Sequence, residues 1–300
     1  MLDFRMETFL TVCRFMNFTR ASEKLNITQP AVSQHIRFLE EHYHAKLFRY
    51  EGRKLKLTEA GEILRNASLT MMHDEQSMQN RMIAGESSEE LYFGATRTIG
   101  DVLMGKILKK YMDQYPDAKI RMIVENTREL LRRLDEGSID FALVEGFFQK
   151  NEYECIRFSA EPYIAVCAAD YPFRVHPEVI EDLFRERLLL REEGSGTREV
   201  LERCLNAQNL SVSDFERTAE AGSLQTIKEL TKAGCGITFL YGTAVQDELK
   251  DGTLIQIPLR NFQVYHEFNF IWRRGSIYGD RYREIFRRFS GQAAAVQERG

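Results

Sequence analysis

The chain has 300 residues, enough for about two domains, and 43% of them are hydrophobic and 29% charged. This composition excludes a disordered tail, and no apolar run approaches the roughly 18–20 residues that a membrane-spanning helix needs. The N-terminal residues lack the layout of a signal peptide, and the five cysteines are widely spaced without a C-x-x-C pair. We therefore expect a cytoplasmic protein with reduced cysteines and no membrane partner.

The net charge of −4 hides an asymmetry along the chain. Residues 1–58, called the head below, contain ten lysines and arginines against six acidic residues, a net charge of +4, which leaves −8 for the rest. A basic head on an acidic body can bind a polyanion by itself, because phosphate attraction acts over about 8–10 Å at physiological salt. The head therefore predicts a nucleic-acid partner, although the total charge argues against one.

The first 45 residues predict three short helices. The first helix carries apolar side chains on one face, namely Met6, Phe9, Leu10 and Cys13. Thr19 can cap the second helix. Thr28 can cap the third, which begins with Gln29-Pro30 and so places proline in the first turn, where its missing N–H costs nothing.

The third helix has two faces of different chemistry. Val32, Ile36 and Leu39 fall within one narrow arc that must face the core. The opposite arc can enter a major groove and bind base edges or phosphate through Ser33, Gln34 and Arg37. This layout predicts a helix-turn-helix that reads DNA, with an ordinary solvated helix face as the alternative.

Residues 49–58 predict a β-hairpin, because polar and apolar side chains alternate around a turn at Gly52. Arg53, Lys54 and Lys56 of this hairpin would lie against DNA phosphates. The head is therefore predicted to be a winged helix-turn-helix domain that spans residues 1–58.

Several motifs of the head combine into a long and specific pattern. They are Phe18-Thr19-Arg20-Ala21-Ser22, Leu25-Asn26-Ile27-Thr28-Gln29-Pro30-Ala31-Val32-Ser33, Lys46-Leu47-Phe48 and Leu57-Thr58-Glu59-Ala60-Gly61. The pattern closely resembles the winged helix-turn-helix of LysR-type transcriptional regulators. In that family a long linker helix joins the head to a two-lobed α/β effector domain, which is similar to periplasmic solute-binding proteins.

The resemblance implies a sequence-specific regulator that activates or represses genes when a small metabolite binds. Its implied partners are double-stranded promoter DNA, further copies of the chain as a dimer or tetramer, and RNA polymerase. The DNA contacts that we expect from the helix, the wing and the resemblance together are Thr28, Gln29, Pro30, Ser33, Gln34, Arg37, Arg49, Arg53 and Lys54.

The head departs from the family pattern at two positions. Tyr50 stands in the wing where the family commonly has arginine, and His44 stands before the wing where it commonly has glycine. The neighbouring Arg49 is the candidate to replace the missing arginine.

The segment from Glu59 to Ala84 predicts one long helix, since it follows a possible cap at Thr58, precedes Gly85, and has neither glycine nor proline after Gly61. Its apolar side chains recur at helical spacing and form a stripe, made of Leu64, Ala67, Met71, Met78 and Met82. We assign residues 59–86 as a linker helix through which two copies dimerise. The alternative is that the stripe packs on its own body.

From residue 89 onward, strands and helices alternate in two sets, which predicts parallel sheets with right-handed crossovers. The first set has strands 91–95, 119–125 and 139–144 with helices 100–115 and 127–136. The second set has strands 164–168, 188–190, 215–220, 236–241 and 253–257 with helices 178–184, 197–207, 223–233 and 243–250, before a last strand 265–272 and a helix 279–290.

The effector domain is thus expected over residues 89–300. Its first lobe takes in about 89–160 and 268–300, and its second lobe about 163–266. The chain would pass between the lobes near 160–162 and 265–267.

Doubly wound sheets bind ligands at the carboxyl ends of their strands, where helix N-termini offer free N–H groups. Hydroxyl and cationic side chains follow several of these predicted strands, and either effector binding or helix capping explains them. The candidate effector contacts are Thr96, Arg97, Thr98, Thr127, Ser195, Thr197 and Ser223. Such a cleft suits a small anionic metabolite, a carboxylate, sulfate-like or phosphate-bearing molecule.

The sequence argues against two other classes of protein. An enzyme is disfavoured because the sequence has no P-loop, no G-x-G-x-x-G and no G-x-S-x-G, and its six histidines show no metal-ligand spacing. We therefore expect no catalytic residues, no metal and no cofactor besides the effector. A solute-binding protein that only buffers a metabolite is disfavoured by the basic head.

Overall fold

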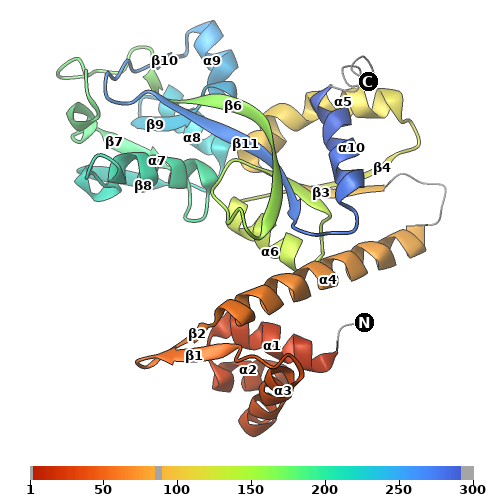
Figure 1. The fold of residues 1–300 in the computed structure, drawn as a ribbon. Helices are drawn as coiled ribbons and strands as arrows, with labels where there is room; N and C mark the ends of the chain where they lie inside the picture. Colours follow the sequence, from red (N-terminus) through yellow and green to blue (C-terminus); the bar gives the residue numbers. More distant parts are fainter. Residues whose placement is uncertain (1–2, 85–89, 292–300) are drawn as a thin grey trace, which may run out of the picture.

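The computed structural model describes residues 3–84 and 90–291. These residues form three parts, which Figure 1 shows as a small head, the long helix α4 and a larger body. The helix α4 lies between the head and the body. No helix within the two described ranges is long and apolar enough to cross a bilayer.

The head contains three helices and a hairpin, as predicted. They are α1 (Phe4–Phe15), α2 (Phe18–Leu25), α3 (Gln29–His42), β1 (Phe48–Glu51) and β2 (Lys54–Leu57). The apolar faces of the helices meet in one core that contains Phe9, Val12, Val32 and Ile36, and Leu55 of the hairpin closes it. Burial of these side chains fixes which face of α3 remains open to solvent.

The caps of the head helices are confirmed at one position and wrong at another. Thr28 caps α3, because its hydroxyl accepts a hydrogen bond from the backbone N–H of Ala31 at 3.3 Å. The cap of α2 is Asn17 rather than Thr19, since the Asn17 side chain accepts from the backbone N–H of Arg20 at 3.0 Å. Both residue types serve as caps, and the earlier one begins the helix at Phe18.

The linker helix α4 (Glu59–Ala84) begins where the sequence predicts, with the Thr58 hydroxyl accepting from the N–H of Gly61 at 3.0 Å. Its predicted end at residue 86 and the stop at Gly85 lie outside the described residues. Leu64 packs into the head core. The rest of the predicted apolar stripe is exposed to solvent, namely Ala67, Met71, Met78 and Met82.

The face of α4 that meets the body is polar. The fully buried His73 places its Nε2 atom 3.1 Å from the backbone oxygen of Asp140. Asp74 accepts hydrogen bonds from the Ser276 hydroxyl at 2.6 Å and the Ile277 N–H at 3.0 Å. The buried Arg273 of the body donates through its Nη2 atom to the backbone oxygen of Asn66 at 3.2 Å. Because these bonds are directional, they fix how α4 lies on the body.

One sheet of nine strands runs through the whole body in the order β4-β3-β5-β11-β6-β9-β7-β8, with β10 beside β6. The strands are β3 (Glu90–Thr96), β4 (Lys119–Glu125), β5 (Phe141–Val144), β6 (Tyr153–Ala168), β7 (Arg187–Leu190), β8 (Arg217–Glu220), β9 (Ile237–Tyr241), β10 (Leu254–Gln256) and β11 (Val264–Arg273). β3 is parallel to β4 and β5, and β7 is parallel to β8 and β9, which agrees with the prediction for these six strands. The prediction is wrong for strands 164–168 and 253–257, because β6 pairs antiparallel with both β9 and β10.

The joining of the two sets differs from prediction. Only residues 164–168 were expected to form a strand, whereas β6 begins at Tyr153 and pairs antiparallel with β11 in both lobes. Pro162 lies opposite Tyr265, and β9 pairs with β6 only from Tyr163 onward. Proline is tolerated there because one edge of the strand is open. The predicted crossing segments thus pair with each other.

The helices of the body cover the two faces of the sheet (Figure 1). They are α5 (Met104–Gln114), α6 (Thr127–Asp135), α7 (Gly196–Asn206), α8 (Leu224–Lys232), α9 (Gln246–Asp251) and α10 (Gly279–Ser290). Two predicted helices are corrected. The segment 178–184 forms only a short 3-10 turn at Ile180–Leu183, and the helix expected from 100 begins as a π-helical turn at Ile99–Leu103.

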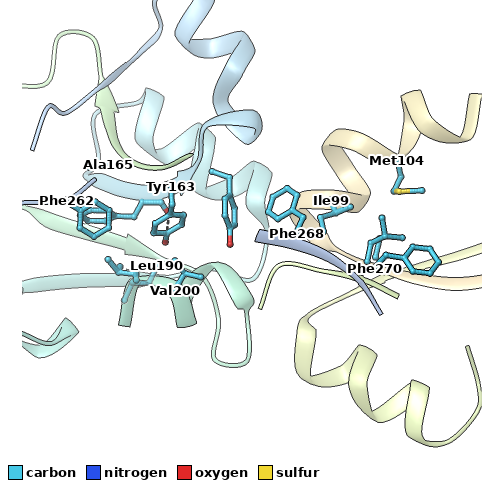
Figure 2. Packing of buried hydrophobic residues seen from close by; sticks show 14 of the residues in the cluster. Ile99, Met104, Tyr163, Ala165, Leu190, Val200, Phe262, Phe268 and Phe270 are labelled. Carbon is cyan, nitrogen blue, oxygen red and sulfur yellow. Dashed lines mark hydrogen bonds between the residues drawn. The ribbon is translucent and has the colours of Figure 1, made fainter. Parts of the chain in front are cut away.

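The largest hydrophobic core continues from one lobe into the other. Figure 2 shows Phe268 on β11 between side chains of the first lobe, such as Ile99 and Phe270, and side chains of the second, such as Tyr163 and Val200. The Tyr163 hydroxyl donates to the backbone oxygen of Thr197 at 2.8 Å, which ties α7 to this core. The start of α7 therefore has a fixed position relative to β6.

The backbone at His44 explains why the family favours glycine there, because its φ is +51°, in the left-handed region. We expect His44→Gly to raise the free energy of unfolding of the head by roughly 0.5–1 kcal/mol, since glycine adopts this conformation without a clash. Native-state hydrogen exchange of the α3 amides measures this. His42→Gly in the last turn of α3 is the control and should lower the same free energy by roughly 0.3–0.5 kcal/mol, the difference between the helix propensities of histidine and glycine. A His44→Gly head that opens more readily than the wild type would contradict this expectation.

Candidate DNA interface and effector cleft

The open face of α3 carries the predicted base-reading residues. Gln34 and Arg37 are exposed, and Ser33 is half-buried. The Gln29 side chain donates to the Ser33 hydroxyl at 3.0 Å, so these two residues are already positioned by each other. Thr28, Gln29 and Pro30 are exposed at the start of the helix. All six predicted contacts of α3 therefore lie at its start or along its open face, the geometry with which a recognition helix enters a major groove.

The basic side chains of the wing differ in whether they form ion pairs within the head. Glu51 binds both Arg49, at 2.8 Å, and Lys56. The contact with Lys56 holds the pKa of the Glu51 carboxyl below its usual range. Arg53 and Lys54 are exposed, and no ion pair joins either to another of the residues that the structure describes. Arg53 and Lys54 are therefore the wing cations most available to phosphate.

The pairing register of the hairpin shows whether Arg49 can take the place of the arginine that the family commonly has at position 50. Arg49 pairs with Lys56 and Tyr50 pairs with Leu55, so the two residues project from opposite faces of the hairpin. Tyr50 lies on the same face as the core residue Leu55 and is 69% exposed. Arg49 therefore does not project where an arginine at position 50 would. Its contact with DNA stays a prediction.

The carboxyl ends of β3 and β5 meet the start of α7 between the lobes. Thr96 ends β3, Glu145 follows β5, and Thr197 lies in the first turn of α7. The Thr197 hydroxyl donates to Glu145 Oε1 at 2.7 Å, and Thr98 Oγ1 lies 3.4 Å from Thr197 Oγ1. Each of these four side chains is at most 1% exposed. We call them the Glu145 cluster.

Two glycines bring the lobes into backbone contact beside this cluster. A Cβ atom built on Gly196 would lie 2.7 Å from the Cα atom of Gly146. A Cβ atom on Gly146 would lie 2.4 Å from Thr127 Oγ1. A side chain at position 196 must push the backbone of Gly146 away, so the lobes close fully here only with glycine at that position, whereas a side chain at position 146 must displace Thr127 within the first lobe.

The carboxyl of Glu145 is incompletely bonded although it is buried. Burial raises its pKa, and the hydroxyls of Thr197, Thr98 and Thr96 together with the charge of Arg191 oppose part of that rise. Several buried polar atoms around it have no hydrogen-bond partner, namely Glu145 Oε2, Thr96 Oγ1, Thr127 Oγ1 and Arg191 Nη1. Buried polar atoms are usually bonded, so a concentration of unbonded ones leaves them available to a water molecule, an ion or a ligand.

Cations stand close to the cluster. Arg191 follows β7, is 3% exposed, and binds Glu192 through its Nε atom at 3.0 Å and its Nη2 atom at 3.2 Å. Arg97 places its Nε atom 3.7 Å from the same carboxylate. Glu192 therefore bridges one arginine from each lobe.

A cavity of about 430 Å³ opens beside the cluster, between α6 and α7. The predicted residues Thr127 and Ser195 line it, together with Arg128 and Phe147. Thr127 is the first residue of α6, and Ser195 is the N-cap of α7 but makes no capping bond through its side chain. N–H groups at the start of both helices therefore lie near the cavity.

The structure brings six of the seven predicted effector contacts to this region. Ser223 is exposed, and its hydroxyl caps α8 by accepting from Thr226 N–H at 3.2 Å, so its contact with an effector stays a prediction. Glu145 and Arg191 are not among the candidate effector contacts that the sequence predicts. Each is the first charged residue after a run of apolar strand residues, and this position at the end of a strand could have identified both.

Among the residues that the structure describes, no three His, Cys, Asp or Glu side chains are grouped so that they could hold a metal ion. The combination of parts defines the class of protein. A winged helix-turn-helix carries DNA-facing residues, and a two-lobed body carries a polar interlobe site, which together are the parts of a ligand-responsive transcription regulator.

The comparisons with known proteins give the family. The family "Bacterial regulatory helix-turn-helix protein, lysR family" matches residues 4–62, and "LysR substrate binding domain" matches residues 84–291. The second match covers more than half of the chain. The chain therefore belongs to the LysR-type transcriptional regulators, a family whose members bind DNA and small-molecule effectors.

Individual relatives agree with this assignment. The HTH-type transcriptional regulator CysL of Bacillus subtilis (strain 168) is 28% identical over 269 residues, which cover 89% of each chain. The fold resembles an H2O2-bound mutant of Corynebacterium glutamicum OxyR, with a TM-score of 0.60, 23% identity, and coverage of 96% of this chain and 91% of that one. It also resembles the regulatory domain of Synechocystis PCC6803 CcmR in complex with 2-PG, with a TM-score of 0.61, 18% identity, and coverage of 69% and 99%.

Phosphate contacts by the wing and base contacts by α3 predict two distinct mutant phenotypes. Arg53→Ala should weaken binding to all DNA sequences and reduce the salt slope by about 0.9, the loss of one phosphate contact. Gln34→Ala should change the preferred sequence at one base pair, by roughly 1–3 kcal/mol. Fluorescence anisotropy with operator and random DNA at several salt concentrations measures both effects.

The matched control is Lys106→Ala, which removes an exposed lysine from α5 of the body and should leave the affinity and the salt slope unchanged. Equal losses for Arg53→Ala and Gln34→Ala on random DNA would show that the two residues do not have separate roles.

Proposed function

We propose that the chain is a transcriptional regulator whose DNA binding responds to a small metabolite with an anionic group, held in the cleft between the two lobes. The observation that carries this proposal is the group of buried polar atoms without partners around the Glu145 cluster. Contacts from both lobes meet there, so a bound molecule would change how the lobes sit together.

The proposed contacts to the effector are Thr96, Arg97, Thr98, Thr127, Ser195 and Thr197. Two features favour an anionic group. The starts of α6 and α7 offer N–H groups, and Arg97 and Arg191 stand beside the cluster. The neighbouring cavity carries both signs of charge, since Arg128 and Arg198 line it together with Glu193, Glu199 and Glu202. The CcmR regulatory domain, which has the same fold, was solved with the small ligand 2-PG.

The route from effector to DNA follows from the contacts of α4. Lobe 1 holds α4 through Asp74 and Arg273, while lobe 2 joins lobe 1 through the pairing of β6 and β11. An effector that binds one arrangement of the lobes more tightly shifts the protein towards that arrangement, to the extent of the difference in affinity. The head follows α4, so its position relative to a second head changes too.

We propose that two copies dimerise through α4. Its exposed stripe supports this, since Met71, Met78 and Met82 point away from the chain's own body and Met82 is 77% exposed. The alternative that the stripe packs on the same chain is disfavoured because the body-facing side of α4 is polar. Tetramer formation and contact with RNA polymerase rest on the family alone, as do a location in the cytoplasm and a role without catalysis.

DNA from the gene's own upstream region and random DNA of equal length test the proposal, each titrated with a panel of small carboxylates and oxyanions with and without an amino group. We expect the specific fragment to bind at least roughly a thousandfold more tightly at physiological salt, and at least one compound to change that affinity. Thr127→Val should shift the dose response to that compound and leave DNA affinity without it unchanged.

The control is Thr218→Val on β8, an exposed threonine outside the cleft, which should respond like the wild type. If no compound in the panel alters DNA affinity, or if random DNA binds as tightly as the upstream fragment, the proposed function is wrong.

A further inference from the structure

The interlobe site contains its own carboxyl group. Glu145 fills the space among the hydroxyls of Thr96, Thr98 and Thr197, at the place where both lobes contribute polar atoms. The one hydrogen bond of good geometry to this carboxyl runs from Thr197 to Oε1, while the hydroxyls of Thr98 and Thr96 lie near enough to lower its pKa and Oε2 is buried without a partner. In the carboxylate form of Glu145, which the neighbouring charge of Arg191 favours, the missing partner is a hydrogen-bond donor, because a second acceptor would leave Oε2 unpaired and would repel it.

A second unbonded atom nearby, on Arg191, is a hydrogen-bond donor and would bind an acceptor. The Nη1 atom of Arg191 is buried and donates to no group, although the Nε and Nη2 atoms of the same side chain bind Glu192. Arg191 is close enough to Glu145 for its charge to lower the pKa of that carboxyl. The site therefore offers a free acceptor and a free cationic donor within one buried region.

The formal charges of the four ionisable groups around the Glu145 cluster balance without a ligand. In their ionised forms Arg97 and Arg191 carry two positive charges, and Glu145 and Glu192 carry two negative ones, while the neighbouring cavity carries charges of both signs. A buried charge is stable only when it is paired, so a ligand that adds net charge would leave one group uncompensated. A ligand with one positive and one negative group meets both free atoms and keeps the balance.

We propose that the effector is a zwitterion of the α-amino-acid class, whose ammonium group binds Glu145 and whose carboxylate binds Arg191. This inference rests on the proposed function and names the ligand of the same cleft. The anionic group expected there is then the carboxylate of the amino acid. Glu145 acts as the specificity-determining residue, because it attracts an ammonium and repels an oxyanion that has no cationic group.

Entry of this ligand requires the lobes to part. Glu145 is 1% exposed, and Gly146 and Gly196 close the backbone over it. Within the described residues the chain passes between the lobes along β6 and β11, which can bend at the register shift between Phe268 and Asn269. The ligand would replace the lost contacts between Glu145 and Thr197 and let the lobes close around it.

The test uses the full-length protein and measures binding by calorimetry and thermal shift. The probes are the L-α-amino acids, the matched acids without the amino group, such as succinate for aspartate, and inorganic sulfate and phosphate. We expect at least one amino acid to bind and its matched acid to bind at least about tenfold more weakly, because the acid leaves Oε2 of Glu145 unpaired.

Glu145→Gln is the decisive variant, because it keeps the shape of the side chain and removes its charge. It should bind the same amino acid at least about tenfold more weakly and should bind sulfate or succinate at least as tightly as the wild type. Glu216→Gln, at an exposed position on lobe 2, is the matched control and should bind the amino acid like the wild type. The thermal midpoint of each variant without ligand reports whether it folds.

Several results would overturn the inference. One is an acid or oxyanion without an amino group that binds the wild type as tightly as every amino acid does. A second is an unchanged amino-acid affinity in Glu145→Gln. A third is the absence of binding by any amino acid at millimolar concentration. In the first case the proposed function still stands if that anion changes DNA affinity, so the two failures are distinguishable.

Discussion

The pairing of β6 with β11 is the interaction on which the rest of the structure depends. These two strands run through both lobes, pair over ten residue positions and make one sheet out of two parallel sets. They therefore fix the distance and the angle at which the carboxyl ends of β3 and β5 face the start of α7. The interlobe site exists because this pairing brings Thr96 and Glu145 of one lobe against Thr197 of the other, with Gly146 and Gly196 allowing backbone contact.

The polar contact of α4 with lobe 1 makes this site relevant to DNA. An apolar face would let the helix slide or exchange partners, whereas Asp74 and Arg273 hold it by directional bonds. The apolar residues of α4 are thereby left on its outer side for another copy of the chain. A change in the lobes thus has a defined mechanical connection to the head, and the +4 charge of the head then meets DNA while the −8 of the remaining residues does not.

Much of this architecture could be predicted from the sequence, because its signals are local. The caps, periodicity and turns of the head fix α3 and the wing, and the family motifs extend that assignment to the whole chain. The crossing strand β6 could not be found this way, since Pro162 and small residues beside it suggest a break, and only pairing with β11 makes the segment a strand. Glu145 was missed for a similar reason. A single acid after a strand gains meaning only when the fold buries it among the hydroxyls of two lobes.

The central claim is that the interlobe site and the DNA interface are energetically coupled. The affinity of the effector, measured with the full-length protein alone and with the protein saturated by its upstream DNA, tests this most directly. Linkage requires the two effector affinities to differ by the same factor by which the effector changes the affinity for DNA. We expect this equality, with a factor of roughly 5–150 that is typical of allosteric coupling. Equal effector affinities with and without DNA would contradict it.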